Sequence, residues 1–122
     1  MSTVCSVPVE VKLALAFMVI DVFTGVLKAV KNKELNSTKA REGIYKKASF
    51  ILLIAFGYLA DYAMDYVDMG FNLPAAATVC TLIIVTEAIS ILENLGQINH
   101  DLVKLVAPFL SALNKKEGEN NG

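Results

Sequence analysis

Three long apolar runs constrain this chain of 122 residues more than any other feature. The runs cover about residues 9–30, 48–66 and 71–92. A helix needs about 20 apolar residues, at about 1.5 Å each, to cross about 30 Å of hydrocarbon. The third run has no charged residue between Asp68 and Glu87. The sequence therefore predicts an all-α membrane protein with three transmembrane helices.

Composition supports one apolar domain and excludes several classes of protein. Hydrophobic residues make up 55% and charged residues 19%, whereas a soluble domain usually has about 25% charged residues. This excess excludes a disordered chain and argues against an ordinary soluble enzyme. The formal net charge of −1 gives no basic surface for nucleic acid, so we expect no nucleic-acid partner.

Motifs for catalysis or metal binding are absent from the sequence. It has no glycine-rich phosphate loop and no arrangement of Ser, His and Asp typical of hydrolases. The single histidine, His100, and the cysteines Cys5 and Cys80 lack the spacing of a zinc site, so the cysteines are expected to be small apolar fillers. We predict no enzymatic activity, no metal and no cofactor.

The C-terminal part of the chain changes character after Glu93. Apolar residues recur there at helical spacing as far as Leu113, while His100, Asp101 and Lys104 take the opposite face. This pattern predicts an amphipathic helix over about 95–113, lying on the inner face of the membrane. Residues 115–122 are polar and are predicted to form a disordered tail.

Charge in the loops predicts the orientation. A basic loop follows the first run, and a short acidic loop at 65–70 follows the second. Positive loops stay in the cytoplasm, so we predict the N-terminus outside and the C-terminus inside. A solvated face is the simpler role for the basic loop, and lipid contact is the alternative. Its basic residues are Lys31, Lys33, Lys39, Arg41, Lys46 and Lys47.

Each run also contains an acid, and an ionisable group inside a membrane is a functional hypothesis. The three acids are Asp21, Asp61 and Glu87, of which Asp61 lies near the outer end and could simply reach headgroups. Helical spacing places two polar faces in the cytoplasmic half of the membrane. The first comprises Asp21, Thr24, Gly25 and Lys28, and the second comprises Glu87, Ser90 and Asn94.

These faces lack counter-charges, since Lys28 is the one basic partner expected at that depth. The acids are then protonated, face water, or meet neighbouring subunits, and the last two alternatives indicate an oligomer. An intrachain polar clasp that only holds the helices together is the other interpretation. Small residues that allow close helix packing are Gly25, Ala29 and Gly57.

Two signatures in this sequence resemble those of the toxin-secretion/phage-lysis holin family. The first joins the end of run one to the start of run two, and the second closes run three, with Gly96 earlier than in the family pattern. The resemblance covers about residues 10–110. The residues that carry it are Asp21, Thr24, Gly25, Lys28, Ala29, Ser37, Gly43 and Lys47, then Glu87, Ser90, Ile91, Glu93 and Asn94.

The resemblance implies a function that the apolar pattern alone does not. Holins oligomerise in the bacterial cytoplasmic membrane and open lesions that release an endolysin, or another protein, without needing to contact it directly. Residues 1–114 would then form a single holin-like membrane domain. Two alternatives remain: a small oligomeric ion or proton channel or transporter subunit that uses the intramembrane acids, and a membrane adaptor that acts through its basic loop.

Overall fold

The computed structural model describes residues 7–121, with side chains as far as Lys116. The secondary structure of this part of the chain is helical only, in the order α2 (Val9–Asn32), α3 (Ser37–Tyr66), α4 (Ala75–Ile98), the 3-10 helix η1 (His100–Leu102) and α5 (Val103–Asn121). The helices α2, α3 and α4 are long and apolar enough to cross a membrane. The predicted class, three spanning helices and a C-terminal helix, is confirmed.

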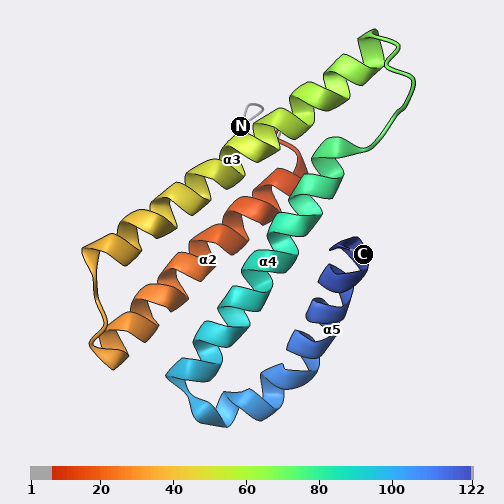
Figure 1. Cartoon of the computed structure of the whole chain (residues 1–122). Coiled ribbons are helices and arrows are strands. Elements are labelled where there is room, and N and C mark those ends of the chain that lie inside the picture. Colours follow the sequence, from red (N-terminus) through yellow and green to blue (C-terminus); the bar gives the residue numbers. More distant parts are fainter. Residues whose placement is uncertain (1–6, 122) are drawn as a thin grey trace.

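The helix α4 organises the bundle. The chain reverses direction between successive long helices, so that neighbours run antiparallel (Figure 1). The helix α4 packs on α2, α3 and α5, whereas α2 and α3 hardly touch each other. A small core joins Ala14 and Met18 of α2, Ile54 of α3, and Cys80 and Ile83 of α4. Cys80 is thus a buried apolar filler, while Cys5 lies outside the described residues.

The connection between α2 and α3 is shorter than the basic loop suggests. Only residues 33–36 are non-helical, because α3 already begins at Ser37, well before the predicted span at 48–66. The Asn36 side chain accepts hydrogen bonds from the backbone N–H groups of Thr38 and Lys39, which caps the helix. Lysine, alanine, arginine and glutamate are also good helix formers. Most of the basic segment is therefore helical.

The start of α4 depends on a residue from another helix. The helix begins at Ala75 rather than at residue 71, and Pro74 in the capping position offers no side-chain cap. Instead, the Asp61 carboxylate accepts hydrogen bonds from the backbone N–H groups of Ala75, at 2.9 Å, and Ala76, at 3.2 Å. Asp61 therefore ties the C-terminal half of α3 to the first turn of α4.

The C-terminal segment differs from the prediction in three ways. The single helix expected at 95–113 is interrupted at Asn99, whose backbone is extended and whose side chain accepts a hydrogen bond from the Asp101 N–H. The helix α5 then folds back along α4 (Figure 1), whereas the sequence predicted a helix lying on the inner face of the membrane. The predicted disordered tail is helical to Asn121, because lysine and glutamate continue the helix readily. Residue 122 lies outside the described part.

Candidate functional site: a charged cluster between three helices

A lysine from α3 joins two acids that lie on α2 and α4. The Lys47 ammonium donates to Asp21 Oδ2 at 2.6 Å and also to Glu87 Oε2. Each of the three long helices thus contributes one charged side chain to the same point of the bundle. Asp21 and Glu87 lie at the middle of their helices, each twelve residues after the first helical residue.

Two polar side chains complete the surroundings of Asp21. The Asn94 amide donates to Asp21 Oδ1 at 3.3 Å and to Thr24 Oγ1 at 3.0 Å. The Thr24 hydroxyl in turn donates to the backbone carbonyl of Ile20 at 3.0 Å. Both oxygens of Asp21 therefore have a donor, as the burial of a carboxylate requires.

Glu87 is less well satisfied than Asp21. Its side chain is fully buried, and no hydrogen bond to Oε1 exists among the described residues. The Lys46 ammonium lies 3.8 Å from this oxygen and also 5.6 Å from the centre of the Phe50 ring. The Lys46 side chain is 45% exposed, so it stands between the buried acid and the surface.

Charge balance in the cluster depends on both lysines. Asp21 and Glu87 together carry two negative charges, and Lys47 alone offsets one of them. Lys46 supplies the second positive charge at longer range. Removing charges from water costs several kcal/mol per ion, and attraction offsets this cost only with good geometry and further hydrogen bonds. The cluster meets these conditions around Asp21 and Lys47, but not at Glu87 Oε1.

The structure brings together four residues of the two predicted polar faces. Asp21 and Thr24 of α2 meet Glu87 and Asn94 of α4 in this cluster. Ser90 is half-buried on α4. The sequence predicted Lys28 as the basic partner of the acids, but in the described part of the chain the salt bridges to Asp21 and Glu87 come from Lys46 and Lys47, and Lys28 is half-buried elsewhere on α2.

Lys47 is the functional residue that sequence reasoning missed, because it was assigned to the basic loop. A signal for it exists in the helix ends. The helix α2 ends at Asn32 and α3 begins at Ser37, so residues at equal distances from the connection lie level. Asp21 lies eleven residues before Asn32, and Lys47 lies ten residues after Ser37. Because the connection between α2 and α3 is short, Asp21 and Lys47 lie at nearly the same level. A prediction of this short connection would have paired them.

The small residues predicted for packing act within the chain. A Cβ atom added at Gly57 would lie 2.9 Å from the Ala76 Cα, so α3 and α4 touch here through their backbones. A Cβ added at Gly25 would lie 3.6 Å from the Asn94 amide nitrogen. Ala29 is half-buried on α2. Gly25 thus faces the cluster and α4 rather than outward.

The other basic residues lie at the surface. The Lys31 ammonium donates to the Ile98 carbonyl at the end of α4, and this bond ties the end of α2 to the elbow before η1. Lys33 ends α2 in the left-handed conformation, with φ of 57°. Lys39 and Arg41 are exposed on the first turns of α3.

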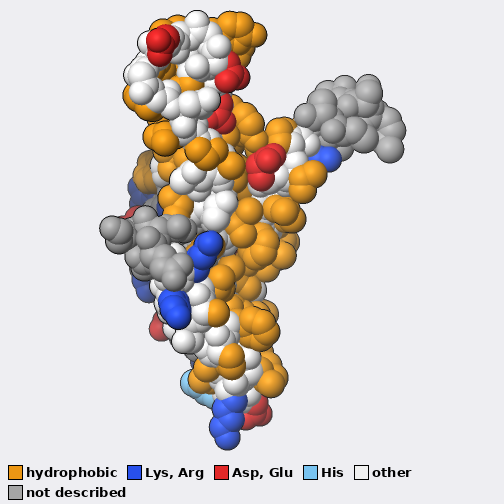
Figure 2. All heavy atoms as spheres, turned by 90° about the vertical axis from the view of Figure 1, so that its right-hand side faces the viewer, with side chains coloured by type: hydrophobic (Ala, Val, Ile, Leu, Met, Phe, Trp, Pro, Cys, Tyr) orange, Lys and Arg blue, Asp and Glu red, His pale blue; other side chains and the backbone are white. Residues whose placement is uncertain are grey.

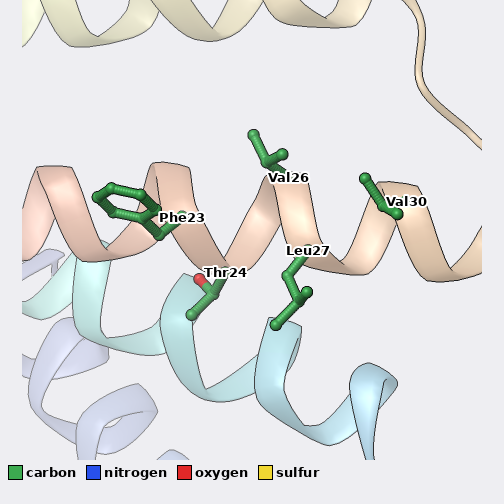
Figure 3. A pocket seen from close by; sticks show the side chains of 5 residues that line it. All are labelled: Phe23, Thr24, Val26, Leu27 and Val30. Atoms are coloured by element: carbon green, nitrogen blue, oxygen red, sulfur yellow. The ribbon is translucent and has the colours of Figure 1, made fainter.

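The outward face of α2 is apolar. A shallow hollow on it is lined by Phe23, Thr24, Val26, Leu27 and Val30 (Figure 3), and Phe23 is 71% exposed. Figure 2 shows hydrophobic side chains as a long band down one side of the molecule. An apolar surface of this extent suits contact with lipid chains. The described residues contain no group of three or more His, Cys, Asp or Glu side chains able to hold a metal ion.

Comparison with known proteins agrees with this architecture. The bacteriophage holin family matches residues 4–115. A probable holin of Bacillus phage phi105 is 35% identical over 111 residues, which cover 89% of this chain and 75% of that protein. The uncharacterized protein YqxH of Bacillus subtilis is 33% identical over 112 residues, with the same coverage of 89% and 75%.

A clostridial relative is similar as well. An uncharacterized 14.9 kDa protein of Clostridium perfringens is 30% identical over 103 residues, covering 84% of this chain and 75% of that protein. No solved structure matches this chain. The family match over nearly the whole chain and the three helices suited to crossing a membrane lead to one conclusion: this membrane protein belongs to the bacteriophage holin family.

Proposed function

We propose that this chain is a holin that oligomerises in the cytoplasmic membrane of a bacterial host and opens lesions through which an endolysin, or another protein, reaches the cell wall. Membership of the family supports this role, and the relative in phage phi105 carries the name probable holin. The partners are further copies of this chain and membrane lipid. The endolysin needs a path across the membrane, not a binding site on this chain.

The observation that carries the proposal is the charged cluster of Asp21, Lys47 and Glu87 in the middle of the bundle. In a dispersed chain Asp21 and Lys47 are largely withdrawn from water, at a cost of several kcal/mol per ion. In an assembly with an aqueous lumen, the same groups become hydrated and that cost falls. The cluster therefore favours conversion from a closed chain to an open assembly once enough copies are present.

The orientation of the chain is part of the proposal. Seven of the basic residues of the chain lie between Lys28 and Lys47, on both sides of the short connection between α2 and α3. The positive-inside rule places this connection in the cytoplasm and the N-terminus outside. A cysteine introduced at position 39 should resist an impermeant thiol reagent added to intact cells. Rapid labelling of this cysteine would show that the orientation is the opposite of the proposed one.

Expression in a bacterial host tests the function. With a co-expressed endolysin, we expect an abrupt fall in membrane potential followed by lysis, and without endolysin the fall alone. A variant truncated within α2 is the control. The alternative, an ion or proton channel that uses the same acids, predicts graded, pH-dependent ion flux and no passage of endolysin. Flux of that kind without lysis would replace the holin assignment.

A further inference from the structure

The first three turns of α3 have little contact with the rest of the described chain, apart from Lys46, which lies 3.8 Å from Glu87 Oε1. All ten residues from Ser37 to Lys46 are exposed. Ala40 and Gly43 precede Lys47 by seven and four residues, which places them on the same side of the helix as that buried lysine. A Cβ atom added at Gly43 would meet no atom within 4 Å. The side of α3 that faces the bundle is therefore open toward its basic end.

The neighbouring face of α2 at the same level is apolar. Gly43 lies six residues after Ser37, and Leu27 lies five residues before Asn32, so the two lie nearly level across the short connection. Leu27 and Val30 are 55% and 53% exposed on the outward face of α2, whereas Val26 points toward α3 (Figure 3). An apolar helix face and a charged helix segment thus occupy the same depth.

Placing the hydrocarbon layer higher or lower on the bundle does not bring the charged segment of α3 out of the membrane. The helices α2 and α4 begin at Val9 and Ala75, each twelve residues before the cluster, which is about 18 Å at 1.5 Å per residue. Moving the hydrocarbon layer beyond these ends would bury the non-helical residues 67–74, whose free backbone groups cost several kcal/mol each in lipid. A layer about 30 Å thick therefore extends about 12 Å below the cluster, roughly to residue 39 of α3.

Charged side chains from Lys39 to Lys46 at this depth require water. From Lys39 to Lys46 the segment holds three basic residues and one acid, so it carries a net charge of +2. Charges at membrane depth are tolerated where they line a water-filled cavity. Water at the inner end of this segment would also reach Glu87 Oε1, which is buried without a hydrogen bond in the described chain.

We infer that Ser37–Lys46 forms one wall of a water-filled inlet, open at the basic end of the bundle and ending at Lys46 and Glu87. When copies of the chain assemble, Ser37–Lys46 faces the lumen, a placement that rests on the proposed function. The lumen is then lined by the start of α3, and the outward face of α2 stays in lipid.

The experiment measures the rate at which a small charged thiol reagent modifies single cysteines in membranes open to both sides. The background carries Cys5→Ser and Cys80→Ala. Gly43→Cys and Ala40→Cys probe the inlet, and Leu27→Cys and Val30→Cys are controls at nearly the same levels on the apolar face. We expect the inlet positions to react about tenfold faster or more, because thiolate forms in water and not in hydrocarbon.

Two results would overturn the inlet. Slow reaction at all four positions would mean that lipid covers the start of α3. Equally fast reaction at positions 27 and 43 would mean that this level lies outside the hydrocarbon layer.

A bulky polyethylene glycol maleimide separates the inlet from the lumen. This reagent should not react with a cysteine at position 43 in inside-out vesicles prepared before lysis. It should react with that cysteine in membranes prepared after lysis. Lysis without labelling at position 43 would show that Ser37–Lys46 does not line the lumen, while the holin function would still hold. If lysis fails but the small reagent still reacts fast at the inlet positions, the holin function is contradicted and the inlet is supported.

Discussion

At the scale of single residues, Lys47 has the largest role in this bundle. Among the side chains that the structure describes, it is the one that bonds to acids from both of the other spanning helices. Its four methylene groups let a residue near the polar end of α3 place its charge deep between α2 and α4. The stability of the closed chain therefore depends on one ammonium group more than on any acid.

Replacing Lys47 by methionine should destabilise the folded chain strongly. Asp21 and Glu87 would face each other without their shared counter-charge, and breaking a buried pair in this way costs about 3–5 kcal/mol. Thermal unfolding in detergent measures the effect, with Lys33→Met as an exposed control. Adding Glu87→Gln to Lys47→Met should recover part of the loss. Equal midpoints for Lys47→Met and the control would contradict the role assigned to the cluster.

Asp61 should matter for structure rather than for the trigger of lysis. Asp61→Ala removes the cap of α4, which costs about 0.5–2 kcal/mol for a helix N-terminus. Asp61→Asn keeps an acceptor oxygen and should lose less. Hydrogen exchange at Ala76 reports the cap, because the Ala75 N–H also donates to the Leu73 carbonyl at 2.9 Å. Unchanged exchange at Ala76 in Asp61→Ala would show that Asp61 does not cap this helix.

At the scale of helices, the contact between α3 and α4 is set by their closest approach. Gly57 faces the backbone of Ala76, so these two helices meet without side chains between them. From Gly57 toward its N-terminus, α3 contributes Lys47 to the cluster and then separates from the other helices. The helices α2 and α4, in contrast, stay packed together along their length. A helix fixed at one end and free at the other suits a molecule that rearranges.

A pair of glycine substitutions in α3 tests this description. Gly57→Ala places a methyl group 2.9 Å from the Ala76 Cα and should destabilise the bundle by about 1–3 kcal/mol, as overpacking does. Gly43→Ala meets nothing and should be neutral or stabilising, by up to about 1 kcal/mol from helix propensity. Unfolding midpoints compare them. The reverse order would place the contact between α3 and α4 elsewhere.

At the scale of the whole molecule, the balance between the closed chain and the open assembly should respond to the charge on Asp21. Asp21→Asn leaves Lys47 paired with Glu87 and keeps the shape that Asn94 and Thr24 contact. The closed chain should persist, while the drive to hydrate the cluster weakens. We expect membrane levels like those of the unchanged protein and lysis that is delayed or lost.

The measurement is the time from induction to collapse of the membrane potential at matched protein levels. Asp65→Asn, an exposed acid of the same chemistry, is the control and should leave this time unchanged. Collapse at the ordinary time in Asp21→Asn would separate the cluster from triggering. Loss of the protein from the membrane would instead assign Asp21 to folding alone.

The sequence by itself determined the three spanning helices and the helical character of the C-terminal segment, because hydropathy and helical periodicity are local properties of the chain. It also identified four members of the cluster, since polar residues at helical spacing in an apolar run must share a face. Only the tertiary structure decided that Lys47 is their counter-charge, that Asp61 caps α4 and that α5 folds back along it. Those contacts join residues between 14 and 40 positions apart, and their partners depend on how helices align and how closely glycines let them approach.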